Sequence, residues 1–188
     1  TPIDEIAEDW VTTLADLDPA IATWIGIPGR LDEYEDLSPE GHAKLSAAGK
    51  AVLARLAKAT VVDDVDWVTK TDLTSDIELS LESDDAGLWM RDVNVIASPA
   101  QYIRDILDLM PTDTVAEWDD IVVRLETIGE PLAGYRASLT AGLVAGEREQ
   151  GLELEVVGEA GTAVRLTVFF ARPGAEAFAQ AQAHAAAV

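Results

Sequence analysis

The chain has 188 residues, of which 13 are basic and 35 acidic, so its formal net charge is −22. Such a charge repels phosphate backbones and anionic lipid surfaces, and we therefore expect neither nucleic acid nor a membrane as a partner. Cysteine is absent from the sequence, which excludes disulfides, thiolate nucleophiles and cysteine-ligated zinc.

The first 36 residues predict two helices and a connection. Thr1 to Asp4 reads as a helix start, with a capping hydroxyl, a proline in the first turn and an acid near the positive end of the helix dipole. A short helix through Trp24 follows the break at Asp18-Pro19, and residues 26–29 form a turn. We expect residues 32–36 to be an acidic, exposed connection. The apolar residues at helical spacing on the first helix are Ile3, Ile6, Trp10, Leu14 and Leu17.

Three further helices are predicted between residues 38 and 110. The first begins with the start signal Ser38-Pro39, and the second runs from about residue 64 to about Trp89. The third covers residues 98–110 and stops there because Pro111 disfavours helix in the residue before it. The residues expected to face inward are Leu45, Val52, Leu53 and Leu56, then Trp67, Leu73, Ile77 and Leu81, then Ile103, Ile106 and Leu107.

The next part of the sequence predicts two helices, which meet near Gly129 and Pro131. A capping box at residues 114–117 begins the first of them. Glycine ends this helix and proline opens the next one. The expected buried face of the first helix comprises Trp118, Ile121, Val122 and Leu125.

Small side chains recur every four residues along the helix that Pro131 opens. Glycine in a helix costs about 1 kcal/mol relative to alanine, so a stripe of glycines implies close approach by another helix or by a bulky side chain. We therefore expect a tight interhelical contact along Gly134, Ser138, Gly142 and Gly146.

The pattern changes from helical to strand-like after residue 150. A small β-hairpin is predicted at about 152–170, followed by an alanine-rich helix from about 175 to 187. The sequence thus predicts a mainly α fold, a multi-helix array of antiparallel helices that carries this hairpin. It divides into a helical region, 1–150, and a divergent tail, 151–188.

No complete active site is recognisable in the sequence. The two histidines, His42 and His184, fall on separate predicted helices, and neither is followed by the glutamate of a zinc-binding H-E-x-x-H motif. The nucleophile motif G-x-S-x-G and the glycine-rich phosphate loops are also absent. We interpret both histidines as surface imidazoles and predict no catalytic, cofactor-binding or metal-binding residue in this chain.

The segment from Arg91 to Arg104 places polar groups beside apolar ones. Its two arginines are scarce cations in a very acidic chain, and one interpretation is that they hold helices together through charge-assisted bonds to Asp or Glu. The functional alternative is that the segment lines a cleft. The candidate cleft-lining residues are Asn94, Gln101, Tyr102 and Arg104.

Residues 1 to about 150 resemble the N-terminal part of the bacterial domain of unknown function 885 family. The match rests on the order and spacing of several short motifs. These are Asp18-Pro19-x-x-Ala22-Thr23-x-x-Gly26, Asp36-Leu37-Ser38-Pro39-Glu40-Gly41, the Arg91-to-Arg104 stretch, Asp108-Leu109-Met110-Pro111, Thr114-x-x-x-Trp118, Arg124-Leu125, Pro131-x-x-Gly134-Tyr135-x-x-Ser138-Leu139 and Gly142-x-x-x-Gly146.

The resemblance implies a parent protein that is a zinc metallopeptidase, similar in fold to the helical Taq-type carboxypeptidases. Members of the family are longer than this chain, and their H-E-x-x-H helix lies downstream of the part seen here. No catalytic residue is therefore carried over, zinc is expected only in the longer parent, and a peptide substrate would bind through the downstream half. The chain departs from the family pattern after Glu147.

A stand-alone helical interaction module without catalysis is the alternative function. Its binding face would be the small-residue stripe together with apolar surface left bare by a missing half, which could also support self-association. The acidic excess is typical of a solubility surface, with a cationic partner or substrate as the second interpretation. We expect a cytoplasmic location, with a removed leader as the alternative, since the chain begins at Thr1.

Overall fold

The computed structural model describes residues 1–27 and 30–144, and every regular element in that part of the chain is a helix. The mainly α fold class predicted from periodicity is therefore confirmed. The predicted hairpin at about 152–170, the alanine-rich helix after it, His184 and Gly146 all lie outside the described residues. Within the described ranges, no helix combines the length and apolar character needed to cross a membrane.

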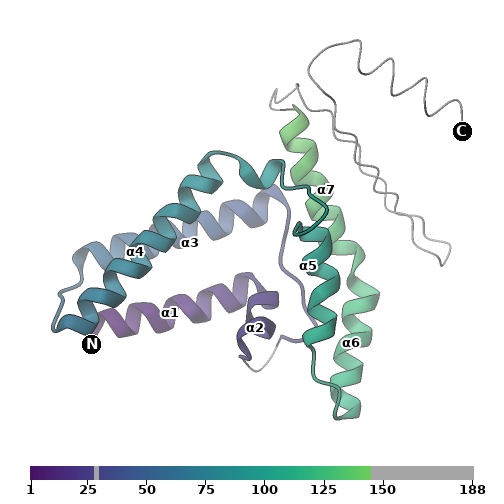
Figure 1. Cartoon of the computed structure of the whole chain (residues 1–188), viewed down its shortest axis with the longest axis horizontal. Coiled ribbons are helices and arrows are strands. Elements are labelled where there is room, and N and C mark those ends of the chain that lie inside the picture. The colour runs from purple at the N-terminus through teal and green to yellow at the C-terminus, as the bar shows by residue number, and fades with distance from the viewer. Residues whose placement is uncertain (28–29, 145–188) are drawn as a thin grey trace, which may run out of the picture.

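Three long helices form one limb of the molecule (Figure 1). They are α1 (Pro2–Leu17), α3 (Pro39–Lys58) and α4 (Asp64–Asp85), and each runs opposite to the one before it. A side-chain cap accepts a backbone N–H at the start of each helix, as the start signals at Thr1 and Ser38 predict for the first two. The shared core of this limb consists of Ile3, Ile6, Val52, Leu56 and Ile77.

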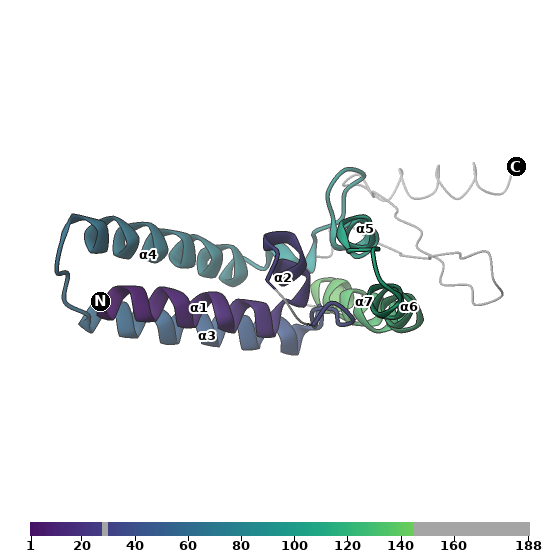
Figure 2. The same cartoon turned by 90° about the horizontal axis from the view of Figure 1, so that it is seen from below.

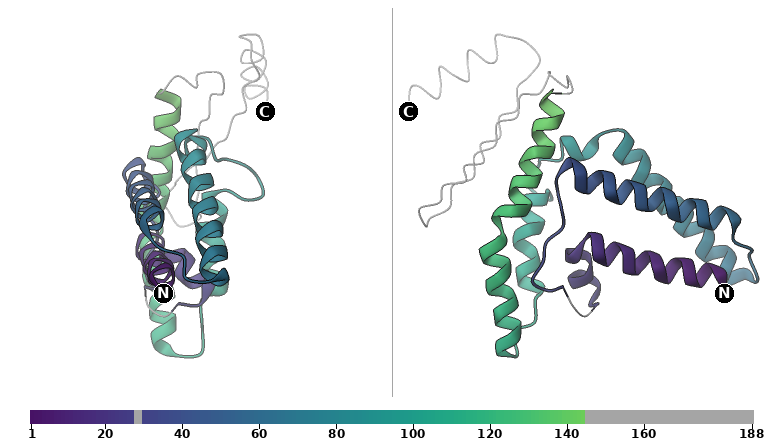
Figure 3. Two further views of the ribbon diagram at one scale, coloured as in Figure 1. Left: turned by 90° about the vertical axis from the view of Figure 1, so that its left-hand side faces the viewer. Right: turned by 180° about the vertical axis from the view of Figure 1, so that it is seen from behind.

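The remaining helices form a second limb, set at a steep angle to the first. It comprises α5 (Pro99–Asp105), the 3-10 helix η2 (Ile106–Leu109), α6 (Val115–Thr127) and α7 (Gly129–Val144). Figure 3 shows α6 and α7 following one another along a single rod, with α5 beside it. The buried apolar side chains of this limb include Ile103, Ile106, Ile121, Tyr135 and Leu139.

Short elements join the two limbs. The helix α2 (Pro19–Ile25) packs against η2, and the 3-10 helix η1 (Leu88–Met90) packs against α7. Figure 2 shows α2 at the junction between the limbs. The extended connection that leads into α3, residues 32–38, runs along the α6–α7 rod. This connection forms one side of the pocket that it shares with α6 and α7.

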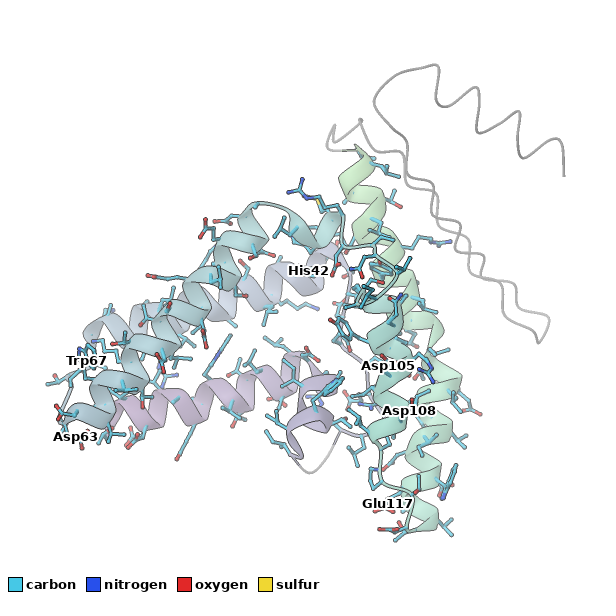
Figure 4. All side chains as sticks on the ribbon, viewed as in Figure 1. His42, Asp63, Trp67, Asp105, Asp108 and Glu117 are labelled. Atoms are coloured by element: carbon cyan, nitrogen blue, oxygen red, sulfur yellow. The ribbon has the colours of Figure 1, made fainter. Side chains whose placement is uncertain are left out.

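The helix α4 differs from its prediction in two respects. It ends at Asp85 rather than near Trp89, because Gly87 takes a left-handed backbone conformation (φ 67°) and turns the chain into η1. The sequence also places Trp67 on the inward stripe, whereas its side chain is 60% exposed. Trp67 lies in the first turn of α4, at the outer end of the limb (Figure 4), where fewer elements cover the helix.

The buried face of α6 also differs from the predicted one. Ile121 is buried as expected, but Trp118, Val122 and Leu125 are 53%, 49% and 50% exposed. The helix is rotated so that Ile121 and Arg124, three residues apart and therefore on one side, face the core. The predicted face counted apolar residues alone, whereas Arg124 is buried because it has hydrogen-bond partners there.

The stripe of small residues on α7 does permit a close approach, as predicted. A Cβ atom on Gly134 would lie 2.9 Å from the backbone nitrogen of Ser38, and one on Gly142 would lie 2.5 Å from the carbonyl oxygen of Met90. Ser138 donates a hydrogen bond of 2.5 Å from its hydroxyl to the carbonyl of Leu37. The neighbour is backbone of the 32–38 connection at Gly134 and Ser138, and backbone of the 3-10 helix η1 at Gly142, where the contact is interhelical as expected.

Candidate functional site

Arg124 of α6 is fully buried, at 0% exposed, although its guanidinium is permanently charged. Its Nε and Nη2 donate hydrogen bonds of 3.0 and 2.8 Å to the carbonyl oxygen of Glu33. Nη2 also donates to the hydroxyl of Thr23 at 3.1 Å. Burying a charge is costly unless such bonds replace those to water. Arg124 thus ties α6 to α2 and to the connection that leads into α3.

Tyr34 lies against the same guanidinium. The central carbon of Arg124 is 5.3 Å from the centroid of the Tyr34 ring, which is within cation–π range. Arg124 Nη1 and the Tyr34 hydroxyl are both buried and have no hydrogen-bond partner within residues 1–27 and 30–144. A buried polar group without a hydrogen-bond partner lowers the stability of a fold by about 1–3 kcal/mol. Water or a ligand can supply the missing bonds.

Two carboxyl groups complete this buried polar cluster. Asp18 caps α2 by accepting a hydrogen bond of 3.0 Å from the backbone N–H of Ile21, and burial raises its pKa. Burial also raises the pKa of Glu35 to about 7, the charge of Asp18 acts in the same direction, and Arg124 opposes both. The Glu35 carboxyl therefore exchanges its proton near neutral pH.

A pocket of about 390 Å³ lies between the connection and the α6–α7 rod. Its volume falls within the ~300–1,000 Å³ typical of small-molecule sites. Residues 32–37 form one side of it, and Val123 and Thr127 of α6 with Glu130 and Pro131 of α7 form the other. The lining contains carboxylates from both sides and no basic residue, so the pocket favours a positively charged occupant.

The polar residues predicted to line a cleft lie in and after the loop that precedes α5. Asn94 folds onto its own loop, where its Oδ1 accepts hydrogen bonds of 2.9 and 2.6 Å from the backbone N–H groups of Ile96 and Ala97. Gln101 belongs to the cap of α5, because its Oε1 accepts a bond of 3.1 Å from the Ser98 N–H. Both side chains therefore stabilise local structure.

The other two predicted residues lie on α5. Tyr102 is 46% exposed. Arg104 pairs with Asp105 at 2.9 Å and with Asp108 at 3.3 Å, so its ion pairs stay within α5 and η2 and join no distant helices (Figure 4 labels both acids). None of the four predicted residues belongs to the pocket of residues 32–37. Their role in lining a cleft stays a prediction.

His42 of α3 is half-buried rather than a surface imidazole. Its ring stacks on Trp89, with centroids 4.5 Å apart and planes inclined by 21°. Burial lowers the pKa of His42, while the charges of Asp84 and Asp36 oppose that shift. Among the residues whose positions are described, no three His, Asp or Glu side chains gather as a metal ion would need. Stacking on Trp89 gives the His42 ring a structural role.

Sequence analysis missed Tyr34, Glu35 and Arg124. A signal existed for the arginine, because it lies three residues after Ile121 and four before Ile128, on the apolar stripe of its helix. A charged residue at such a position is buried only with partners. No comparable signal marks Glu35, since its burial depends on where the 32–38 connection packs.

Two limbs of helices, with a buried arginine beside an acidic pocket, give the described part of the chain a mainly α fold. The family model for the bacterial protein of unknown function DUF885 matches residues 19–188. The chain belongs to this family, as the ordered motifs predict. The matched range includes every residue of the polar cluster except Asp18. A search of the curated proteins finds no match to the chain.

Proposed function

We propose that this chain is the N-terminal helical part of a zinc-dependent metallopeptidase of the carboxypeptidase kind. The observation that carries the proposal is membership of the DUF885 family over residues 19–188. The longer members of this family resemble helical zinc peptidases. In this proposal the chain supplies part of the cleft wall. The zinc ion and the H-E-x-x-H helix belong to a downstream region, the substrate is a peptide, and the location is cytoplasmic.

The arrangement of the helices supports a wall rather than a catalytic centre. The first limb is a three-helix unit with its own core, and the second limb meets it at a steep angle (Figure 1). Arg124 fixes the 32–38 connection to α6 through the Glu33 carbonyl. A wall fixed in this way can hold a peptide against a metal centre built by other residues.

The test compares the 188-residue chain with a longer family polypeptide that contains this chain and a downstream H-E-x-x-H. We expect the longer protein to hold about one zinc ion and to release C-terminal residues from peptides, and we expect a Gln in place of the motif's Glu to abolish hydrolysis. The 188-residue chain should do neither. Stoichiometric zinc binding by the 188-residue chain, or a zinc-free longer protein, contradicts the proposal.

A second candidate function is a helical interaction module without catalysis. It is favoured by the exposed side of α6, which carries an apolar stripe one side chain wide. Val115 is 78% exposed, and Trp118, Val122 and Leu125 are each about half exposed. Asp119 and Glu126 flank this stripe and are exposed, whereas Arg124 is buried. A partner helix with an apolar face and basic flanks fits such a surface.

The two functions make different predictions for the stripe when the chain is alone. Under the interaction hypothesis, the chain self-associates or binds a hydrophobic dye, and Leu125→Glu reduces both. Sedimentation velocity and dye fluorescence measure these properties. The exposed Val68 on α4 provides the matched control, because Val68→Glu should leave them unchanged. A monomer that binds no dye eliminates the interaction hypothesis and leaves the peptidase proposal intact.

A further inference from the structure

The pocket formed by residues 32–37 and the α6–α7 rod has the charge and shape of a ligand site in its own right. We propose that it binds an organic monocation, a primary ammonium or a guanidinium on a short apolar stem, with the Glu35 carboxylate as its counter-ion. Leu37, Val123 and Pro131 provide apolar contacts in the same pocket. The inference concerns binding by this chain and is independent of the peptidase proposal.

The carboxylates of the pocket are not equally available to a ligand. Glu33 pairs with Arg30 at 2.5 Å, and Asp36 pairs with Lys44 at 3.1 Å. Both cations are solvent-exposed side chains, at 40% and 62%. By contrast, Asp32, Glu35 and Glu130 form no ion pair within the described ranges, and the buried Arg124 compensates their negative charge only in part.

Orphaned polar atoms indicate where a ligand would bind. Glu35 Oε2 and the Tyr34 hydroxyl both belong to pocket-lining residues, and both atoms are buried without a hydrogen-bond partner in the part of the chain described. A carboxylate only accepts hydrogen bonds, and an ammonium or guanidinium only donates them. A cation in the pocket therefore complements the charge of the Glu35 carboxylate, whereas an anionic ligand would be repelled by it.

Arg124 does not supply the hydrogen bond that Glu35 lacks. Two of its nitrogens are committed to the Glu33 carbonyl, and the third, Nη1, makes no hydrogen bond within the described residues. Its charge nevertheless fails to restore an ordinary pKa at Glu35, which stays raised to about 7 by burial. A second cation beside Glu35 would favour the ionised carboxylate.

The experiment titrates the 188-residue chain at pH 8 with n-butylammonium, n-butylguanidinium and, as the neutral analogue, n-butanol. Amide resonances of residues 32–37 and 123–130 report on the pocket. We expect saturable shifts with millimolar affinity for at least one of the two cations and none for n-butanol. Glu35→Gln should weaken binding about tenfold, the effect of losing one charge-assisted hydrogen bond. Glu78→Gln, at an exposed position on α4, should bind as the unmodified chain does.

A second variant tests the cavity rather than its charge. Thr127→Phe fills the pocket and keeps every carboxylate, so it should abolish the shifts, whereas Thr140→Phe at an exposed position of α7 should not. Circular dichroism confirms that each variant is folded. Equal affinity in Glu35→Gln, equal shifts with n-butanol, or unsaturable shifts spread over all acidic faces would each overturn the proposal.

Discussion

Arg124 and the carbonyl oxygen of Glu33 lie 91 residues apart in sequence and are joined by two hydrogen bonds, of 2.8 and 3.0 Å. The guanidinium can reach both bonds because its N–H groups form a rigid fork. The contact fixes the connection before α3 to the last turn of α6. It thereby holds one wall of the acidic pocket against the other.

Replacing Arg124 should destabilise the fold. Arg124→Ala leaves the Glu33 carbonyl and the Thr23 hydroxyl without their donor and opens a cavity, so we expect a loss of about 3 kcal/mol in the free energy of unfolding. Arg124→Lys should recover only part of it, because an ammonium lacks the fork geometry. Urea denaturation measures both losses. The exposed Arg136 of α7 is the control, and a loss in Arg136→Ala as large as that in Arg124→Ala would contradict the assignment.

The pH dependence of stability should contain a contribution from Glu35. Its pKa is about 7 in the folded chain against 4.5 ordinarily, so between these values the folded state binds more protons than the unfolded state. Stability therefore falls as pH rises through this window, by up to about 3 kcal/mol for this group. The buried Asp18 nearby acts with the same sign, and Arg124 reduces the effect.

Glu35→Gln isolates that contribution. The glutamine stays neutral, so the variant should be the more stable protein at pH 8 and should lose this advantage towards pH 4.5. His42 has a lowered pKa and acts with the opposite sign below pH 6.5, but it is present in both proteins and cancels in the comparison. Chemical denaturation at several pH values checks the prediction. A stability difference that does not change with pH would show that Glu35 ionises normally in the fold.

Two glycines of the α7 helix should respond oppositely to alanine. In Gly142→Ala the new Cβ would lie 2.5 Å from the carbonyl oxygen of Met90, so η1 must shift, and we expect a loss of about 1–3 kcal/mol. At Gly129 no atom lies within 4 Å of the added Cβ, and alanine should stabilise by up to about 1 kcal/mol through helix propensity. Thermal unfolding of the two variants distinguishes them. Equal effects at both positions would mean that η1 does not pack against α7 this closely.

Neighbouring residues on α6 should differ in the same assay. Ile121 is 8% exposed, and Ile121→Ala should cost about 2–4 kcal/mol. Val122 is 49% exposed, and Val122→Ala should change stability by less than about 0.5 kcal/mol. Sequence periodicity assigns both residues to the buried face. A large loss at Val122 would indicate that a partner or another part of the protein covers this side of α6.

Local signals determined where most helices begin and end. Caps at Thr1, Ser38 and Thr114 accept backbone N–H groups as expected, because capping depends on a few neighbouring residues. Hydrophobic spacing also found the core positions of the first limb. The ordered motifs identified the family, which the match over residues 19–188 shows.

The sequence by itself thus determined the helical class, the caps and the close approach along α7, since each follows from chemistry within a few turns of chain. Only the tertiary structure decided which side of α6 is buried and that Glu35 shares a cluster with Arg124. Those outcomes depend on where the 32–38 connection lies against a rod that begins almost 80 residues later. Burial of a charge is settled by its distant partners, and residue type alone does not reveal them.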